Sequence, residues 1–150
     1  MQLTPAALLW RLVVSGAGSA PPAPPGTMPV LVATSPLIGA PPLLRLHVKV
    51  RYGDTVLDFV PQAPTAPATL RTLLSGRAVD GVIRTMPARG NDSESWQTVG
   101  HAALAEQELQ EYACGLPSEL SLLSNNCWTF AGSVVGYAEA GIGTGSRDTT

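Results

Sequence analysis

The stretch SNNCWTFAG, residues 124–132, places a cysteine directly after two asparagines. Cys127 opens an apolar pattern with helical spacing, and Asn125 or Asn126 is of a residue type that caps helices. A thiol in the first turn of a helix lies beside unpaired N–H groups and the positive end of the helix dipole, which favour the thiolate. Cys127 is therefore a candidate nucleophile.

A thiol nucleophile needs a base, and the sequence contains two histidines, His47 and His101. His47 lies in an alternating stretch that predicts a strand, where its side chain would be held rigidly. Asp58 lies on the expected partner strand and could accept a hydrogen bond from the second imidazole nitrogen. Cys127, His47 and Asp58 would then serve as nucleophile, base and orienting residue.

The same pattern also fits a packing role for Cys127. Cysteine is among the most buried residue types, and this one lies on an apolar helical face. The face consists of Cys127, Phe130, Ala131, Val134, Val135 and Ala138. Lys49 is expected opposite Asp58, where it could bind the carboxylate instead of His47. His47 also shares its strand face with Lys49 and Arg51, whereas the other face carries the apolar residues.

The hairpin that carries His47 and Asp58 has a sharply defined turn. Gly53 opens a two-residue loop of the kind that needs positive φ at its first position. This turn sets Tyr52 opposite Thr55. It makes His47 and Asp58 diagonal neighbours on one face, roughly 7–8 Å apart at the backbone.

The remaining patterns predict short strands followed by helices. Strands are expected over 29–34, 78–86 and 95–102, the hairpin over 43–61, and helices over 65–77, 102–117 and from Cys127 onward. The apolar stripe of the 102–117 helix is expected to be Ala105, Leu109, Tyr112 and Leu116. Gly132 and Gly136 are expected to admit a close neighbour. The order predicts an α+β domain in which a small, mainly antiparallel sheet packs against two C-terminal helices.

The first part of the chain differs in charge from the rest. Residues 1–44 contain one Arg and no Asp, Glu or Lys. We expect residues 1–28 to be a targeting leader with a proline-rich linker, residues 29–140 to be the domain, and 141–150 to be a flexible tail. A transit peptide would place the protein in the chloroplast. A signal peptide is an alternative, and initiation at Met28 would leave the protein in the cytoplasm.

The sequence lacks the features that are typical of several classes of function. The net charge is −2 and no block of Lys or Arg stands out, which argues against nucleic-acid binding. The apolar run over 6–14 is too short to span a membrane. No cofactor motif is present, because neither a phosphate loop nor a dinucleotide fingerprint occurs. Weaker alternatives are a zinc site from Cys114, Cys127, His47 and His101, and a disulfide between the two cysteines.

Four segments together carry a resemblance. They are LHVKVRYGDTVLDFVPQAP, LLSGRAVDGVIR, WQTVGHA and NNCWTFAGSVVGYAE. A strand histidine, an acidic residue on the next strand and a late helix opening with Asn-Cys resemble the circularly permuted papain-like superfamily. That superfamily includes lecithin retinol acyltransferase-like proteins, NlpC-like peptidases and deSUMOylating isopeptidases. More narrowly, residues 43–140 are similar to a plant and algal family of uncharacterised proteins expected in plastids.

The resemblance implies a papain-like fold and a thiol hydrolase or acyltransferase. Cys127 matches the nucleophile, His47 the base and Asp58 the third polar residue. The substrate would be an amide, isopeptide or ester of an unknown protein or lipid, and no cofactor or metal would be needed. A non-catalytic binding or assembly module of the same superfamily is the alternative. One departure is that CWTF carries no polar residue directly after the cysteine.

Overall fold

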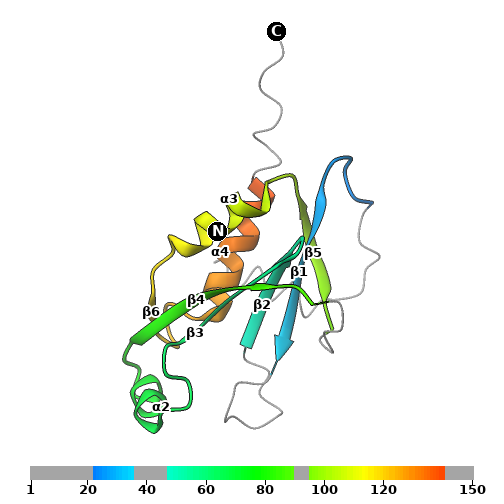
Figure 1. Cartoon of the computed structure of the whole chain (residues 1–150). Coiled ribbons are helices and arrows are strands. Elements are labelled where there is room, and N and C mark those ends of the chain that lie inside the picture. Colours follow the sequence, from blue (N-terminus) through cyan, green and yellow to red (C-terminus); the bar gives the residue numbers. More distant parts are fainter. Residues whose placement is uncertain (1–21, 36–46, 90–94, 141–150) are drawn as a thin grey trace.

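The computed structural model describes residues 22–35, 47–89 and 95–140. Its strands are β1 (Met28–Ser35), β2 (His47–Tyr52), β3 (Thr55–Pro61), β4 (Val79–Pro87), β5 (Gln97–Ala102) and β6 (Glu119–Leu120). Its helices are α2 (Pro67–Leu74), α3 (Glu106–Cys114) and α4 (Cys127–Ala140), as Figure 1 shows. Residues 1–21 of the expected leader (1–28) and the expected tail (141–150) lie outside the described residues.

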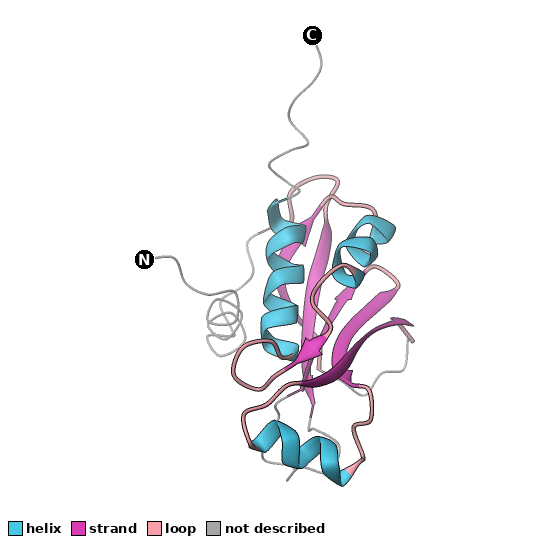
Figure 2. Cartoon of the chain, turned by 90° about the vertical axis from the view of Figure 1, so that its left-hand side faces the viewer, coloured by secondary structure: helices cyan, strands magenta, loops and turns pink. Residues whose placement is uncertain are grey.

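The six strands form one antiparallel sheet in the order β5-β1-β2-β3-β4-β6. α3 and α4 pack together over one face of this sheet, and α2 lies beyond one end of it (Figure 2). The predicted α+β class, with an antiparallel sheet against two C-terminal helices, is confirmed. Among the described segments, no helix has both the length and the apolar character needed to cross a membrane.

The β2–β3 hairpin follows the predicted register through its turn. Tyr52 lies opposite Thr55, and Val50 lies opposite Leu57. Gly53 has a φ of 60°, in the left-handed region that glycine adopts without strain. The turn chemistry therefore set the pairing, as expected from the sequence.

The hairpin turn is also fastened to α3. Glu106 Oε2 accepts hydrogen bonds from the Asp54 N–H at 3.2 Å and from Thr55 Oγ1 at 2.9 Å. A Cβ atom at Gly53 would overlap the Glu106 carboxylate. Glycine at this position therefore serves both the turn conformation and the contact with the helix.

The predicted apolar face of α4 is buried along its whole length. Its buried residues are Cys127, Phe130, Ala131, Gly132, Val134, Val135 and Ala138. This face packs against β2, β3 and β5, and the Phe130 ring centroid lies 5.8 Å from that of Phe59. The expected close approach at Gly136 is wrong, because a Cβ there would meet nothing within 4 Å.

α3 begins later than its pattern predicted. The segment through Ala102 belongs to β5, where Ala102 pairs with Met28 and His101 with Pro29. Strand pairing at this edge outweighs the helical preference of the alanines. The expected stripe is partly wrong, because Ala105 is the exposed N-cap and the buried residues of α3 are Leu109 and Ala113.

β6 was not predicted. Its two residues pair with β4 through Leu120–Val79 and Glu119–Asp80. A strand this short carries no readable alternation, so only the partner strand defines it.

We expect Phe59→Ala to lower the free energy of unfolding by about 3–5 kcal/mol, because it leaves a cavity beneath α4. Phe59 is 1% exposed. Leu74→Ala is the control, since Leu74 is 71% exposed and its loss should change stability by less than about 0.5 kcal/mol. Urea unfolding of both variants measures the difference, and equal midpoints would contradict this core.

We expect Gly53→Ala to destabilise the fold by about 2 kcal/mol or more, through strain at positive φ and loss of the Glu106 hydrogen bonds. Gly26→Ala is a matched control, because Gly26 has a φ of 74° and a Cβ there would meet nothing within 4 Å. The control should lose about 1 kcal/mol at most. Equal losses in urea unfolding would show that Glu106 adds nothing at the turn.

Candidate functional site

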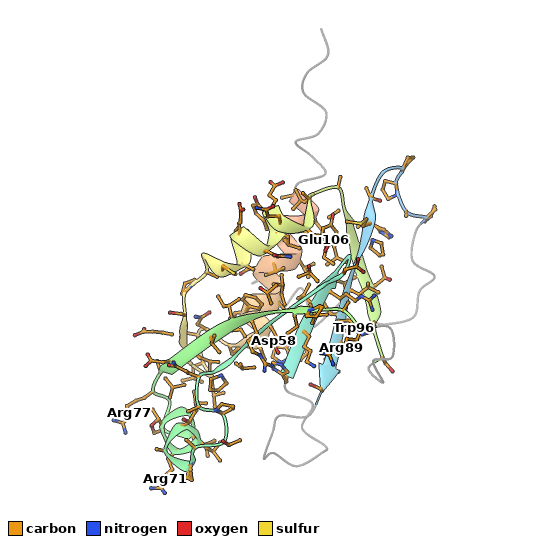
Figure 3. All side chains as sticks on the ribbon, in the orientation of Figure 1. Asp58, Arg71, Arg77, Arg89, Trp96 and Glu106 are labelled. Carbon is orange, nitrogen blue, oxygen red and sulfur yellow. The ribbon has the colours of Figure 1, made fainter. Side chains whose placement is uncertain are left out.

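His47 and Asp58 meet across β2 and β3. His47 is the first residue of β2, and its Nε2 lies 3.0 Å from Asp58 Oδ2. Both residues are buried, with 7% of His47 and 0% of Asp58 exposed. Figure 3 shows Asp58 within the body of the sheet, far from Arg71 and Arg77 at the α2 end. The contact expected between the imidazole and the carboxylate is therefore present.

The Asp58 carboxylate has a second partner that the sequence analysis did not identify. Arg84 lies directly opposite Asp58 in the β3–β4 register. Its Nε donates to Oδ1 at 2.8 Å and its Nη2 donates to Oδ2 at 2.5 Å. Lys49 had been expected to compete for this carboxylate, but the side chain that forks onto both oxygens is Arg84. The sequence predicts a strand that contains Arg84, but it does not show that this strand pairs with β3.

Cys127 is the first residue of α4, and Asn126 caps the helix. Asn126 Oδ1 accepts hydrogen bonds from the N–H groups of Trp128 at 2.9 Å and Thr129 at 3.1 Å. In return, Thr129 Oγ1 accepts a hydrogen bond from the Asn126 N–H at 2.9 Å. This reciprocal cap fixes where the helix begins and so fixes the position of the thiol.

The preceding asparagine holds the loop that leads into the helix. Asn125 Nδ2 donates to the carbonyl oxygens of Pro117 at 3.1 Å and Glu119 at 2.6 Å. The backbone of Asn125 also pairs with that of Ser121 in an isolated bridge. The two asparagines therefore have separate tasks, since one anchors the loop to β6 and the other caps α4.

Charge and hydrogen bonding link the three candidate residues. Burial by itself would lower the pKa of His47, because it disfavours the charged imidazolium. Hydrogen bonds to Asp58 and Cys127, and the charges of both groups, outweigh burial and raise that pKa from 6.5 to about 9. Burial would raise the pKa of Asp58, but hydrogen bonds from His47 and Arg84 hold it below its ordinary value. The arrangement favours an imidazolium between two acceptors.

The contact between His47 and Cys127 is made at one end of the sheet. The β2–β3 pairs end at Val50–Leu57, so His47 lies beyond the part of β2 that pairs with β3, although it still pairs with Ser35 of β1. α4 begins at this same end and runs alongside β2 (Figure 1). The strand face of His47 was expected to turn this residue away from the helix. Because His47 and Cys127 are the first residues of β2 and α4, their side chains still come into contact.

The other candidate residues lie elsewhere. Cys114 is exposed, Cys127 is buried, and no disulfide joins them. His101 is half-buried on β5. Among the described residues, no three His, Cys, Asp or Glu side chains are grouped so that they could hold a metal ion. The two cysteines are therefore free in this structure, and the four residues of the zinc alternative are not grouped together.

One surface cavity has a volume of about 430 Å³. It lies between α2, β4 and β6, and its lining residues are Gln62, Ala63, Thr69, Ala78, Val79, Asp80 and Glu119. None of the three candidate residues lines it. Cys127 itself is 9% exposed.

Comparisons of the chain with protein-family models, with curated proteins and with solved structures gave no match. The functional assignment therefore depends on the geometry of these side chains.

The raised pKa of His47 predicts how stability depends on pH. The folded protein holds this proton more tightly than the unfolded chain, so the resulting stability is complete below about pH 6.5 and is lost as the pH rises through about 9. We expect the free energy of unfolding to fall by up to about 3 kcal/mol over this window.

Urea unfolding at several pH values measures this fall. His47→Gln should remove it, and His101→Gln should retain it. A parent protein whose stability is flat across the window would contradict the raised pKa.

Proposed function

We propose that this protein is a thiol hydrolase or acyltransferase that acts on an amide, isopeptide or ester through Cys127 and His47. The observation that carries the proposal is the continuous chain of polar contacts from Cys127 through His47 to Asp58. A buried cysteine that only filled space would not need an imidazole and a carboxylate behind it. The resemblance to the permuted papain-like superfamily adds to the proposal.

The chemistry follows from the pair. The imidazole takes the thiol proton, and the Cys127 thiolate attacks the substrate carbonyl carbon. His47 then gives the proton to the leaving amine or alcohol as the carbon–heteroatom bond breaks, which leaves a thioester on Cys127. Water or a second acceptor, deprotonated by His47, attacks the thioester and releases the thiol. No metal or cofactor takes part in these steps.

Asp58 would keep the His47 imidazole in the same orientation throughout the catalytic cycle. Its Oδ2 accepts a hydrogen bond from His47 Nε2, which leaves Nδ1 for exchange of the proton with the sulfur. The carboxylate also stabilises the imidazolium that forms when the thiolate is generated. Asp58 is therefore a positioning residue rather than a proton carrier.

A non-catalytic binding or assembly module is the second candidate. The low exposure of Cys127, at 9%, favours it, because a substrate carbonyl must reach the sulfur. The lack of Asp and Glu in residues 1–44 supports a plastid location as part of the same proposal, with the cytoplasm as the alternative.

Alkylation of the thiol by iodoacetamide separates an activated cysteine from a packing residue. We expect Cys127 to react in the folded protein at neutral pH, because the His47 imidazole is bonded to its thiol and can activate it. His47→Ala should slow the reaction at least about tenfold at neutral pH while the fold remains intact. The modified residue is identified by peptide mass analysis, with exposed Cys114 as the internal reference.

Cys127→Ser should abolish hydrolysis or acyl transfer of any substrate found, with little loss of stability. A packing residue would behave differently. Its alkylation would follow global unfolding and would not respond to His47→Ala. That result would reject the enzyme proposal and favour the binding module.

A further inference from the structure

Arg84 is the residue of the polar cluster that the proposed chemistry does not use. It reaches the site from β4, which pairs with β3 through the full length of β3. The side chain of Arg84 is 45% exposed, whereas that of Asp58 is 0% exposed. The Asp58 carboxylate is therefore not exposed to water, whereas the guanidinium that binds it is partly exposed.

The geometry of the fork fixes the carboxylate in two ways. Nε binds Oδ1 at 2.8 Å and Nη2 binds Oδ2 at 2.5 Å, so the guanidinium holds both carboxylate oxygens at once. His47 Nε2 lies 3.0 Å from the same Oδ2 that receives Nη2. Asp58 Oδ2 therefore accepts hydrogen bonds from two cationic groups. A stronger bond to Arg84 weakens the bond to His47, because both bonds draw on the charge of the same oxygen.

We propose that Arg84 is a positioning residue of the thiol site: its fork sets the plane of the Asp58 carboxylate, and its fixed charge loosens the grip of that carboxylate on the His47 proton. This inference rests on the proposed function. A proton held too tightly by Asp58 and His47 would not pass to a leaving group. Arg84 would therefore set the upper pH limit at which His47 remains charged.

The sign of the effect follows from the charges around the imidazole. In the described part of the chain, the groups that act directly on the imidazole are Asp58 on β3 and Cys127 on α4. The other charged or titratable side chains on these strands and this helix are Lys49, Arg51 and Tyr52 on β2, Asp80 and Arg84 on β4, and Tyr137 and Glu139 on α4. Asp58 and Cys127 stabilise the imidazolium, and the permanent charge of Arg84 opposes it. Removal of the Arg84 charge should make His47 keep its proton to a higher pH.

The titration of the histidine ring protons by NMR measures this directly. The chain contains two histidines, so the His47 signal is assigned with a His101→Gln variant. We expect Arg84→Met and Arg84→Gln to raise the His47 midpoint by about one pH unit. Arg84→Gln keeps a hydrogen-bond donor at the carboxylate and so provides a folded neutral variant if Arg84→Met is unstable. Arg84→Lys restores the charge and should return the midpoint towards that of the parent.

Arg71→Met is the matched control, because Arg71 is exposed on α2 and lies far from Asp58 (Figure 3). It should leave the His47 midpoint unchanged. An ion pair with a purely structural role would lower the stability of the Arg84 variants but would not move the midpoint. Midpoints that stay at the parent value in both neutral variants would overturn the proposal.

The alkylation profile of Cys127 extends the same test. In Arg84→Met, the part of the alkylation profile that depends on His47 should move to higher pH by the same amount as the His47 midpoint. If His47→Ala slows alkylation but the Arg84 variants do not change its pH profile, only the role of Arg84 is rejected. If His47→Ala has no effect on alkylation, the proposed function itself fails.

Discussion

A carboxylate without access to water organises the centre of this protein. Asp58 is 0% exposed on β3, and a buried charge is tolerated only when its oxygens are bonded and its charge is balanced. The balance comes from Arg84 on the next strand and from His47 on the preceding one. Three consecutive strands of the sheet are therefore connected by one polar cluster. The loss of any one member would leave a buried charge or a buried donor unmatched.

The His47 imidazole connects this cluster in the sheet to helix α4. His47 is bonded to Asp58 on one side, and its pKa also responds to Cys127 on α4. The start of α4 is set independently by the Asn126 cap, and the preceding loop is held by Asn125. Two separate devices thus bring a thiol and an imidazole to the same end of the molecule. This convergence is the structural basis of the role proposed for Cys127.

Patterns that depend on neighbouring residues were readable from the sequence. The turn at Gly53 set the register of the hairpin, and the apolar spacing from Cys127 gave the buried face of α4. Features that depend on distant pairing were not readable. Arg84 reaches Asp58 only because β4 returns alongside β3 after α2, and no local pattern specifies that return. The start of α3 was misplaced for the same reason, because pairing with β1 keeps Ala102 in a strand.

The central proposal is that His47 activates the thiol of Cys127. Thiolate absorbance in the ultraviolet, taken as the difference between the parent and Cys127→Ser across pH, measures it most directly because Cys114 is common to both proteins. We predict a difference whose dependence on pH changes in a His47→Ala background. A difference with the same dependence on pH with and without His47 would contradict the proposal.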